Sequence, residues 1–282
     1  MRIPAHVCML MLCLPGSGAI FYAQTPANAP LPDSRQLFER ALASEKKLAA
    51  EQERYECRIT DEGAETDKNG KVKHENVAVQ EQFYVNGVPI ERTLSKNGKD
   101  LTPDQTRKED ERVMKETVKY SDKARADKEA AKQEHEAEDI LSAMMLTNGR
   151  REQINGRSVL FYNIVPNPGF QAKNMNQRFA TVMQGTISLD EQTGELIEMN
   201  IKSVKDLKIV GGVIGSLNKG FWLHVHNHQE PDGVWLNDLS EGSGDARALL
   251  FIHPYFRFKE TTGSCHLYTT SASQVAPAKT MQ

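Results

Sequence analysis

Long hydrophobic runs are missing from this chain of 282 residues. The apolar segment at residues 7–14 (VCMLMLCL) is far shorter than the roughly 20 residues that a membrane-spanning helix needs. Arg2 precedes it, a helix-breaking stretch follows at residues 15–18, and small residues at positions 23 and 27–29 offer cleavage sites. We therefore predict a signal peptide over residues 1–29 and a mature chain that is periplasmic or secreted and does not span a membrane. An uncleaved anchor is the alternative.

Cysteine is scarce, and two of the four cysteines lie in the predicted signal peptide. Neither Cys8 nor Cys13 follows the small residues that lipoprotein processing requires, so a lipid anchor is disfavoured. Cys57 and Cys265 lie in the first and the last apparent strand. In an oxidising compartment such a pair predicts one disulfide, which requires these two strands to be neighbours. Two independent buried thiols are the alternative.

An excess of positive charge is also absent, because 35 basic residues face 38 acidic ones and the formal net charge is −3. Lys and Arg are interleaved with Asp and Glu along the chain. A protein that binds nucleic acid needs a concentrated basic face. The composition therefore excludes nucleic acid as the principal partner.

The pattern of apolar residues predicts an α+β fold. Asp33 is a suitable N-cap for a first helix within residues 30–54, in which Leu37 and Leu48 recur at helical spacing. From Tyr55 onward the period changes to two, with Asn-Gly turns at residues 69–70, 86–87 and 97–98. We predict one domain over residues 30–270 built on a large antiparallel sheet of about ten strands, followed by a disordered tail at residues 271–282.

The pattern of residues 103–147 differs from the period-two alternation of the predicted strands, and it predicts a long, charged helical insertion. Thr102 and Gln105 form a capping-box pattern, Pro103 stands at the first helical position, and residues 148–149 (Asn-Gly) indicate a stop. A break is expected at Ser121 and Asp122, since Asp122 can cap a second helix. Sustained heptads are absent, so we expect a solvated face rather than a coiled coil.

Motifs for chemistry are also missing, and no nucleophile elbow or histidine–serine pair is evident. His224, His226 and His228 alternate on one strand and share a face, but residues two apart on a strand lie nearly 7 Å apart and three in a row reach one metal poorly. We therefore expect no metal site, no cofactor and no enzyme. A hydrolase assembled from distant residues remains an alternative.

Residues 210–220 are rich in glycine but lack the Gly-Lys-Ser/Thr ending and the following helix of a phosphate loop. We expect a flexible flap whose apolar residues Val213, Ile214 and Leu217 form a lid over an apolar cavity.

Several turns and strand starts together resemble a known group of exported proteins. They lie at residues 55–60, 68–71, 83–90, 94–101, 187–190, 211–212, 221–224 and 233–236. The chain resembles uncharacterised exported proteins that are similar to the LolA/LolB lipoprotein carriers and the stress regulator RseB. The resemblance implies a curled half-barrel whose concave apolar face is covered by helices and holds acyl chains. The insertion at residues 103–147 is longer than a lipoprotein carrier requires.

These observations lead to one functional hypothesis and one alternative. The chain is predicted to be a periplasmic, non-catalytic protein that sequesters acyl chains of lipids or lipoproteins in an apolar half-barrel cavity. The alternative is an envelope protein-interaction or stress-sensor module that uses the charged insertion. The candidate ligand-binding residues lie on the late strands: Met199, Phe221, Leu223, Val225 and Trp235.

Overall fold

The computed structural model describes residues 29–67, 69–209, 215–248 and 255–267. Residues 1–28 of the predicted signal peptide, the predicted tail and two of the predicted lid residues, Val213 and Ile214, lie outside this part of the chain. Within it, no helix is both long and apolar enough to cross a membrane.

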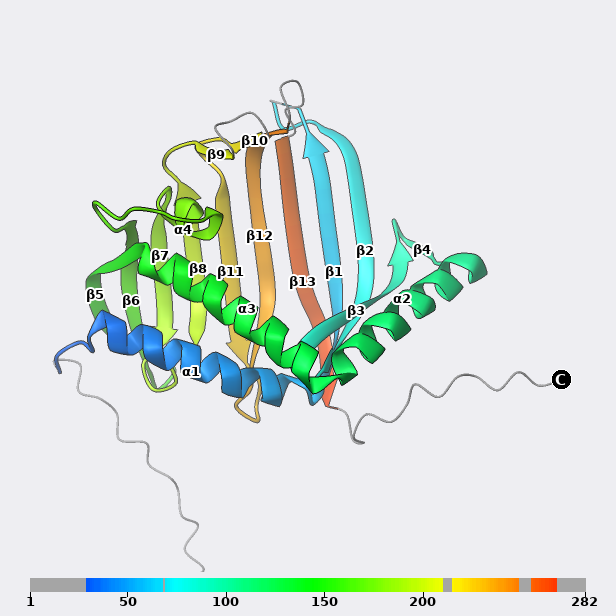
Figure 1. The fold of residues 1–282 in the computed structure, drawn as a ribbon, viewed down its shortest axis with the longest axis horizontal. Coiled ribbons are helices and arrows are strands. Elements are labelled where there is room, and N and C mark those ends of the chain that lie inside the picture. Colours follow the sequence, from blue (N-terminus) through cyan, green and yellow to red (C-terminus); the bar gives the residue numbers. More distant parts are fainter. Residues whose placement is uncertain (1–28, 68, 210–214, 249–254, 268–282) are drawn as a thin grey trace, which may run out of the picture.

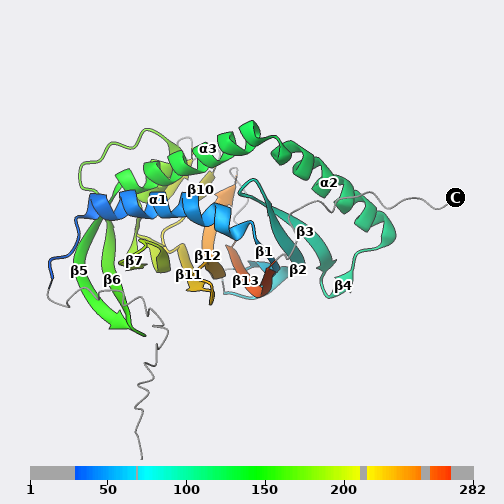
Figure 2. The ribbon, with the colours of Figure 1, turned by 90° about the horizontal axis from the view of Figure 1, so that it is seen from below.

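One curled antiparallel sheet dominates the fold, as the sequence predicted, but it has 13 strands rather than about ten. Its order is β4-β3-β2-β1-β13-β12-β11-β8-β7-β6-β5, and β10 and β9 extend it beside β12. The sheet is not closed, so it forms a half-barrel (Figures 1 and 2). The strands are β1 (Tyr55–Thr66), β2 (Val72–Val85), β3 (Val88–Lys96), β4 (Lys99–Asp100), β5 (Met144–Ile154), β6 (Arg157–Pro166), β7 (Met183–Asp190), β8 (Leu196–Ser203), β9 (Leu207–Ile209), β10 (Gly215–Leu217), β11 (Trp222–Gln229), β12 (Trp235–Ala248) and β13 (Tyr255–Leu267).

The helices lie on one side of this sheet. They are α1 (Ser34–Gln52), α2 (Pro103–Ser121), α3 (Lys123–Ser142) and α4 (Met175–Ala180). Figure 2 shows α1 and α3 across the open side of the curl, with α2 continuing toward the β3–β4 edge. We call the side of the sheet turned toward the helices the inner face and the opposite side the outer face.

The helix starts follow the predicted chemistry. The Gln36 backbone N–H donates to Asp33 at 3.3 Å, Thr102 and Gln105 form the capping box that starts α2, and the Asp122 side chain caps α3. The end of α3 differs from our prediction, because the helix stops at Ser142 and β5 begins at Met144. Asn148, with a φ of +51°, lies instead at a register shift within β5. Strand pairing with β6 thus replaces the last expected turn of the helix.

The predicted disulfide is confirmed. Cys57 on β1 faces Cys265 on β13 in register, with a Cα–Cα distance of 4.1 Å and a sequence separation of 208 residues. The first and last long strands are therefore neighbours, as the pairing required.

Apolar contacts near both ends of α1 hold this helix to the sheet. Leu37 is fully buried against Leu160 and Tyr162, and Leu48 packs on a cluster that contains Tyr55 and Leu236. The apolar stripe read from the sequence is therefore a packing surface, which holds α1 over the ends of the strands (Figure 1).

A buried ion pair holds the segment just before α1. The Arg151 guanidinium, whose side chain is 2% exposed, donates to both carboxylate oxygens of Glu191 at 2.5 and 2.7 Å. The same guanidinium donates to the backbone carbonyls of Ala29 and Pro30, and Ser158 donates to Glu191. These bonds lower the pKa of Glu191 against the opposing effect of its burial, and they anchor the start of the described chain to β5.

Candidate ligand-binding face

The largest apolar cluster lies on the inner face between the sheet and α4. Its buried members come from four strands and from the residues just before β7 and β11: Ile164, Val182, Met183, Ile201, Leu207 and Phe221. Phe221 packs edge-on against Phe179 of α4 at a centroid distance of 6.1 Å and lies 6.2 Å from Phe256 of β13. The cluster therefore joins the middle of the sheet to its helical cover.

A rim of half-buried apolar side chains surrounds this cluster and includes two of the five predicted ligand residues and one predicted lid residue. Met199, Leu217 and Leu223 pack against it, as do Phe256 and Phe258. Phe221 itself is fully part of the core. The candidate set predicted from the sequence therefore combines a core residue with rim residues. Alternation along a strand predicts the face on which a side chain lies, but not how deeply it is buried.

Two other predicted residues lie differently. Val225 pairs in register with Met199 and is half-buried, so it extends the same face. Trp235 is buried, but the Arg157 guanidinium lies 5.4 Å from its ring centre, and Arg157 also binds Asp190. Trp235 pairs in register with Gln229, and the Gln52 side chain of α1 donates to its backbone carbonyl at 3.1 Å, so it lies near the end of these strands, away from Met199 and Leu223.

Small residues shape the middle of the inner face. A Cβ built on Gly242 would come within 2.7 Å of the Phe258 ring, and one on Gly244 within 3.0 Å of the Phe256 ring. Because Gly242 and Gly244 carry no side chains, both rings can lie over β12 at these two positions. Gly63 pairs in register with Phe258 from the other side, and a Cβ there would meet no atom within 4 Å. Open space therefore lies on the inner face beside Phe258.

Beyond Gly63 the inner face becomes acidic, which the sequence analysis did not predict. Glu260 on β13 pairs in register with Asp61 on β1, and burial together with the nearby Glu91 and Asp61 carboxylates raises the pKa of Glu260. Burial, Glu260 and Glu91 raise the pKa of Tyr84 to about 12.

His224 and His226 of β11 lie on the outer face, whereas His228 follows a register shift in the pairing with β12 and lies opposite Leu236. His224 contacts the carboxylates of Glu198 at 3.0 Å and Glu241 at 3.2 Å, and His226 contacts Asp238 at 2.7 Å. His228 contacts Glu230 at 3.1 Å. Each ring thus has its own carboxylate partner. In the described ranges no group of three or more His, Cys, Asp or Glu residues is arranged to hold a metal ion.

The helical insertion binds the edge of the sheet. The Thr93 backbone N–H on β3 donates to Glu109 at 2.8 Å, and Arg112 donates to Glu109 and to the Glu91 carbonyl. Arg112 and the Thr93 N–H lower the pKa of Glu109 to about 2. These contacts satisfy backbone groups on a strand that β4 covers only at its end, and so they protect an edge.

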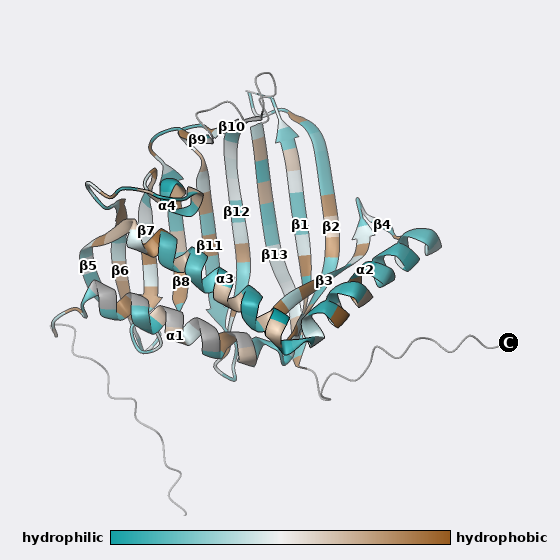
Figure 3. Cartoon of the chain, in the orientation of Figure 1, coloured by the Kyte–Doolittle hydropathy of each residue, from teal (hydrophilic) through white to brown (hydrophobic). Residues whose placement is uncertain are grey.

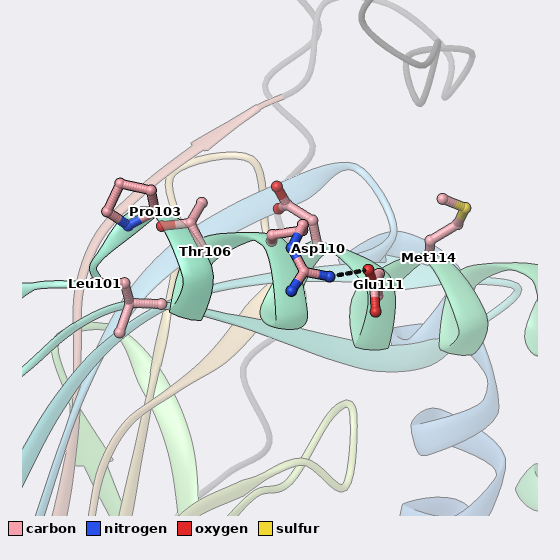
Figure 4. Close-up of a pocket in the computed structure, with 7 residues that line it drawn as sticks. Leu101, Pro103, Thr106, Asp110, Glu111 and Met114 are labelled. Atoms are coloured by element: carbon pink, nitrogen blue, oxygen red, sulfur yellow. Dashed lines mark hydrogen bonds and ion pairs between the residues drawn. The ribbon is translucent and has the colours of Figure 1, made fainter.

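The opposite side of α2 is hydrophilic except for a few apolar residues (Figure 3). Met114 and Val118 are 48% and 68% exposed. Met114 also borders a shallow recess of about 500 Å³ that runs to Leu101 and Pro103 at the start of the helix (Figure 4). The Arg107–Glu111 ion pair crosses this recess at 2.8 Å.

Comparison with known proteins finds no matching family model and no matching curated protein. Among solved structures, a putative outer membrane lipoprotein-sorting protein domain from Vibrio parahaemolyticus aligns at 9% identity and a TM-score of 0.33, covering 84% of this chain and 95% of its own. A DUF1329 family protein from Desulfovibrio piger aligns at 8% and 0.29, covering 84% and 94%. MucB, in its complex with MucA(peri), aligns at 8% and 0.23, covering 84% and 100%. At TM-scores below 0.5 these alignments establish neither a family nor a ligand for this chain.

Proposed function

We propose that this chain is an exported, non-catalytic binding protein that holds an acyl chain of a lipid or lipoprotein against the inner face. The observation that carries the proposal is the rim of half-buried apolar side chains beside the open space over Gly63. Burial of each methylene group contributes about 0.8 kcal/mol, so a chain lying along Leu223, Phe256 and Phe258 would bind without any covalent step. The candidate ligand contacts are Met199, Leu223 and Val225, with Phe221 supporting them from the core.

Native mass spectrometry of the mature protein, purified from a periplasmic fraction without detergent, tests this proposal. We expect a stoichiometric adduct that releases a lipid or an acylated peptide on extraction. A chain that stays free of adduct even after incubation with lipid would overturn it. The mass of the mature chain also tests cleavage of the predicted signal peptide.

A matched pair of variants locates the site. Gly63→Leu fills the open space on the inner face, and Gly63 has no positive φ, so a side chain is sterically allowed there. Thr60→Leu adds an apolar side chain to the outer face of the same strand, because alternate residues point to opposite faces. We expect Gly63→Leu to lose the adduct and Thr60→Leu to keep it. Equal adducts in both variants would place the ligand elsewhere.

A second candidate function is an envelope protein-interaction or stress-sensor module. The observation that favours it is the pair of exposed apolar residues on α2, Met114 and Val118, beside the recess at Leu101. Deleting the insertion is a poor test, because α2 hydrogen-bonds the edge of β3. The double variant Met114→Glu and Val118→Glu should instead abolish cross-linking to an envelope partner, with Lys128→Glu on α3 as the control.

A further inference from the structure

A second concave site lies on the outer face, opposite the proposed acyl-binding face. It is a recess of about 280 Å³ over β1, β12 and β13. The backbone of Gly63, Gly242 and Phe258 forms its floor, since the side chains of these residues belong to the inner face. Outer-face side chains form its walls: Glu62, Ala64, Glu75, Trp222, Glu241, Arg257 and Lys259.

The two tryptophans of the chain differ in burial and in whether a cation lies near the ring. Trp235 is buried and has the Arg157 guanidinium 5.4 Å from its ring centre. Trp222, which is 40% exposed, borders the recess, and no cation of the described chain lies over its ring. The face of an indole attracts a cation more strongly than that of any other side chain. Trp222 therefore presents an unoccupied cation-binding surface.

The charges around this ring also favour a cation. Three carboxylates, Glu62, Glu75 and Glu241, line the recess against two basic side chains. One of these bases, Arg257, is bound to Glu75 at 3.1 Å. Glu241 is held at 3.2 Å by Nδ1 of His224, which positions the carboxylate on the strand beside Trp222. An aromatic ring next to positioned carboxylates is the arrangement that recognises organic ammonium groups.

We infer that this outer recess binds an organic ammonium group, which lies over the Trp222 ring and is neutralised by Glu241 on the neighbouring strand. The inference rests on the outer face alone and is independent of the proposed acyl-chain binding on the inner face. A lipid headgroup and a free amine share this chemistry, and the experiment distinguishes them.

Tetramethylammonium chloride is the first probe, titrated into the mature protein against sodium chloride at matched ionic strength. Saturable quenching of Trp222 fluorescence is expected, with an affinity measured in parallel by calorimetry. Trp222→Leu should weaken binding by about tenfold, and Trp222→Phe should weaken it less because a ring remains. Glu241→Gln should weaken binding several-fold, while Glu152→Gln on distant β5 should not change it.

Binding to phosphatidylcholine vesicles in the same assay would assign the site to a lipid headgroup, and binding of the small ion alone would assign it to a free ammonium compound. No saturable binding, equal affinity in Trp222→Leu, or a preference for inorganic phosphate would overturn the inference. Circular dichroism confirms that each variant folds. The acyl-chain adduct should persist in Trp222→Leu, so failure at one face is distinguishable from failure at the other.

Discussion

Glu81 on β2 shares a hydrogen bond with Glu56 on the neighbouring strand β1. Two carboxyl groups make such a bond only when one of them keeps its proton. This bond, together with burial and the charge of Glu56, raises the pKa of Glu81 from 4.5 to about 7. The outer face therefore carries an acid that holds its proton close to neutral pH.

The first prediction concerns the pH dependence of stability. Between pH 4.5 and 7 folded Glu81 keeps a proton that the unfolded chain has lost, so the free energy of unfolding should fall as pH rises through this window. The stabilisation is complete below pH 4.5 and is lost above pH 7. Urea unfolding at pH 5 and pH 8 measures the difference. Glu81→Gln, which keeps a donor for Glu56 without titrating, should flatten the slope; an unchanged slope would contradict the assignment.

The second prediction concerns the disulfide between Cys57 and Cys265. Its 208-residue separation strongly restricts the unfolded chain, so its loss should cost about 2–5 kcal/mol. Thermal unfolding of the oxidised protein, the reduced protein and the Cys57→Ala, Cys265→Ala double variant measures this cost. The reduced and double-variant proteins should agree with each other. A melting temperature that reduction leaves unchanged would contradict the prediction.

The third prediction compares two ion pairs that start at adjacent residues. Arg151→Ala leaves the Glu191 carboxylate buried without its partner and should cost about 3–5 kcal/mol. Arg150→Ala breaks the exposed pair with Glu152 and should cost about 1 kcal/mol or less. Denaturant unfolding of both variants at pH 7 gives the comparison. Equal costs would mean that burial does not set the strength of the Arg151 pair.

The fourth prediction concerns two glycines on separate strands of the sheet, Gly185 on β7 and Gly63 on β1. A Cβ on Gly185 would come within 1.8 Å of the Asn200 carbonyl oxygen on β8, whereas a Cβ on Gly63 would meet nothing within 4 Å. Gly185→Ala should therefore separate β7 from β8 and lower the yield of folded protein, while Gly63→Ala should fold normally. Expression yield and thermal unfolding of the two variants decide the matter.

The architecture was predictable because it depends on local signals. Asp33, Thr102 and Asp122 marked helix starts through capping chemistry that needs only neighbouring residues. Alternation identified the strands and the shared face of His224 and His226 on β11. The end of α3 was not predictable, because pairing between β5 and β6 over a long sequence distance competes with the local helical tendency.

The candidate site was only partly predictable. Met199, Leu217 and Leu223 do lie together around one cluster, but Trp235 lies apart from them at the start of β12, where it pairs with Gln229. The acidic end of the inner face and the Trp222 recess could not be predicted from the sequence for another reason. Each is assembled from β1, β13 and at least one more strand, and a single sequence does not reveal strand order.

The place of β13 in the sheet has a consequence for how the chain is completed during synthesis. In the described chain, β13 alone connects the β4–β1 half of the sheet to the β12–β5 half. Both halves are synthesised before this strand. Until residues 255–267 have been synthesised, they can form only two separate meanders with unpaired edges at β1 and β12. A chain truncated before Tyr255 would lack the joint altogether. The disulfide between Cys57 and Cys265, whose formation passes two electrons to an external oxidant, forms only after the last strand has paired with the first.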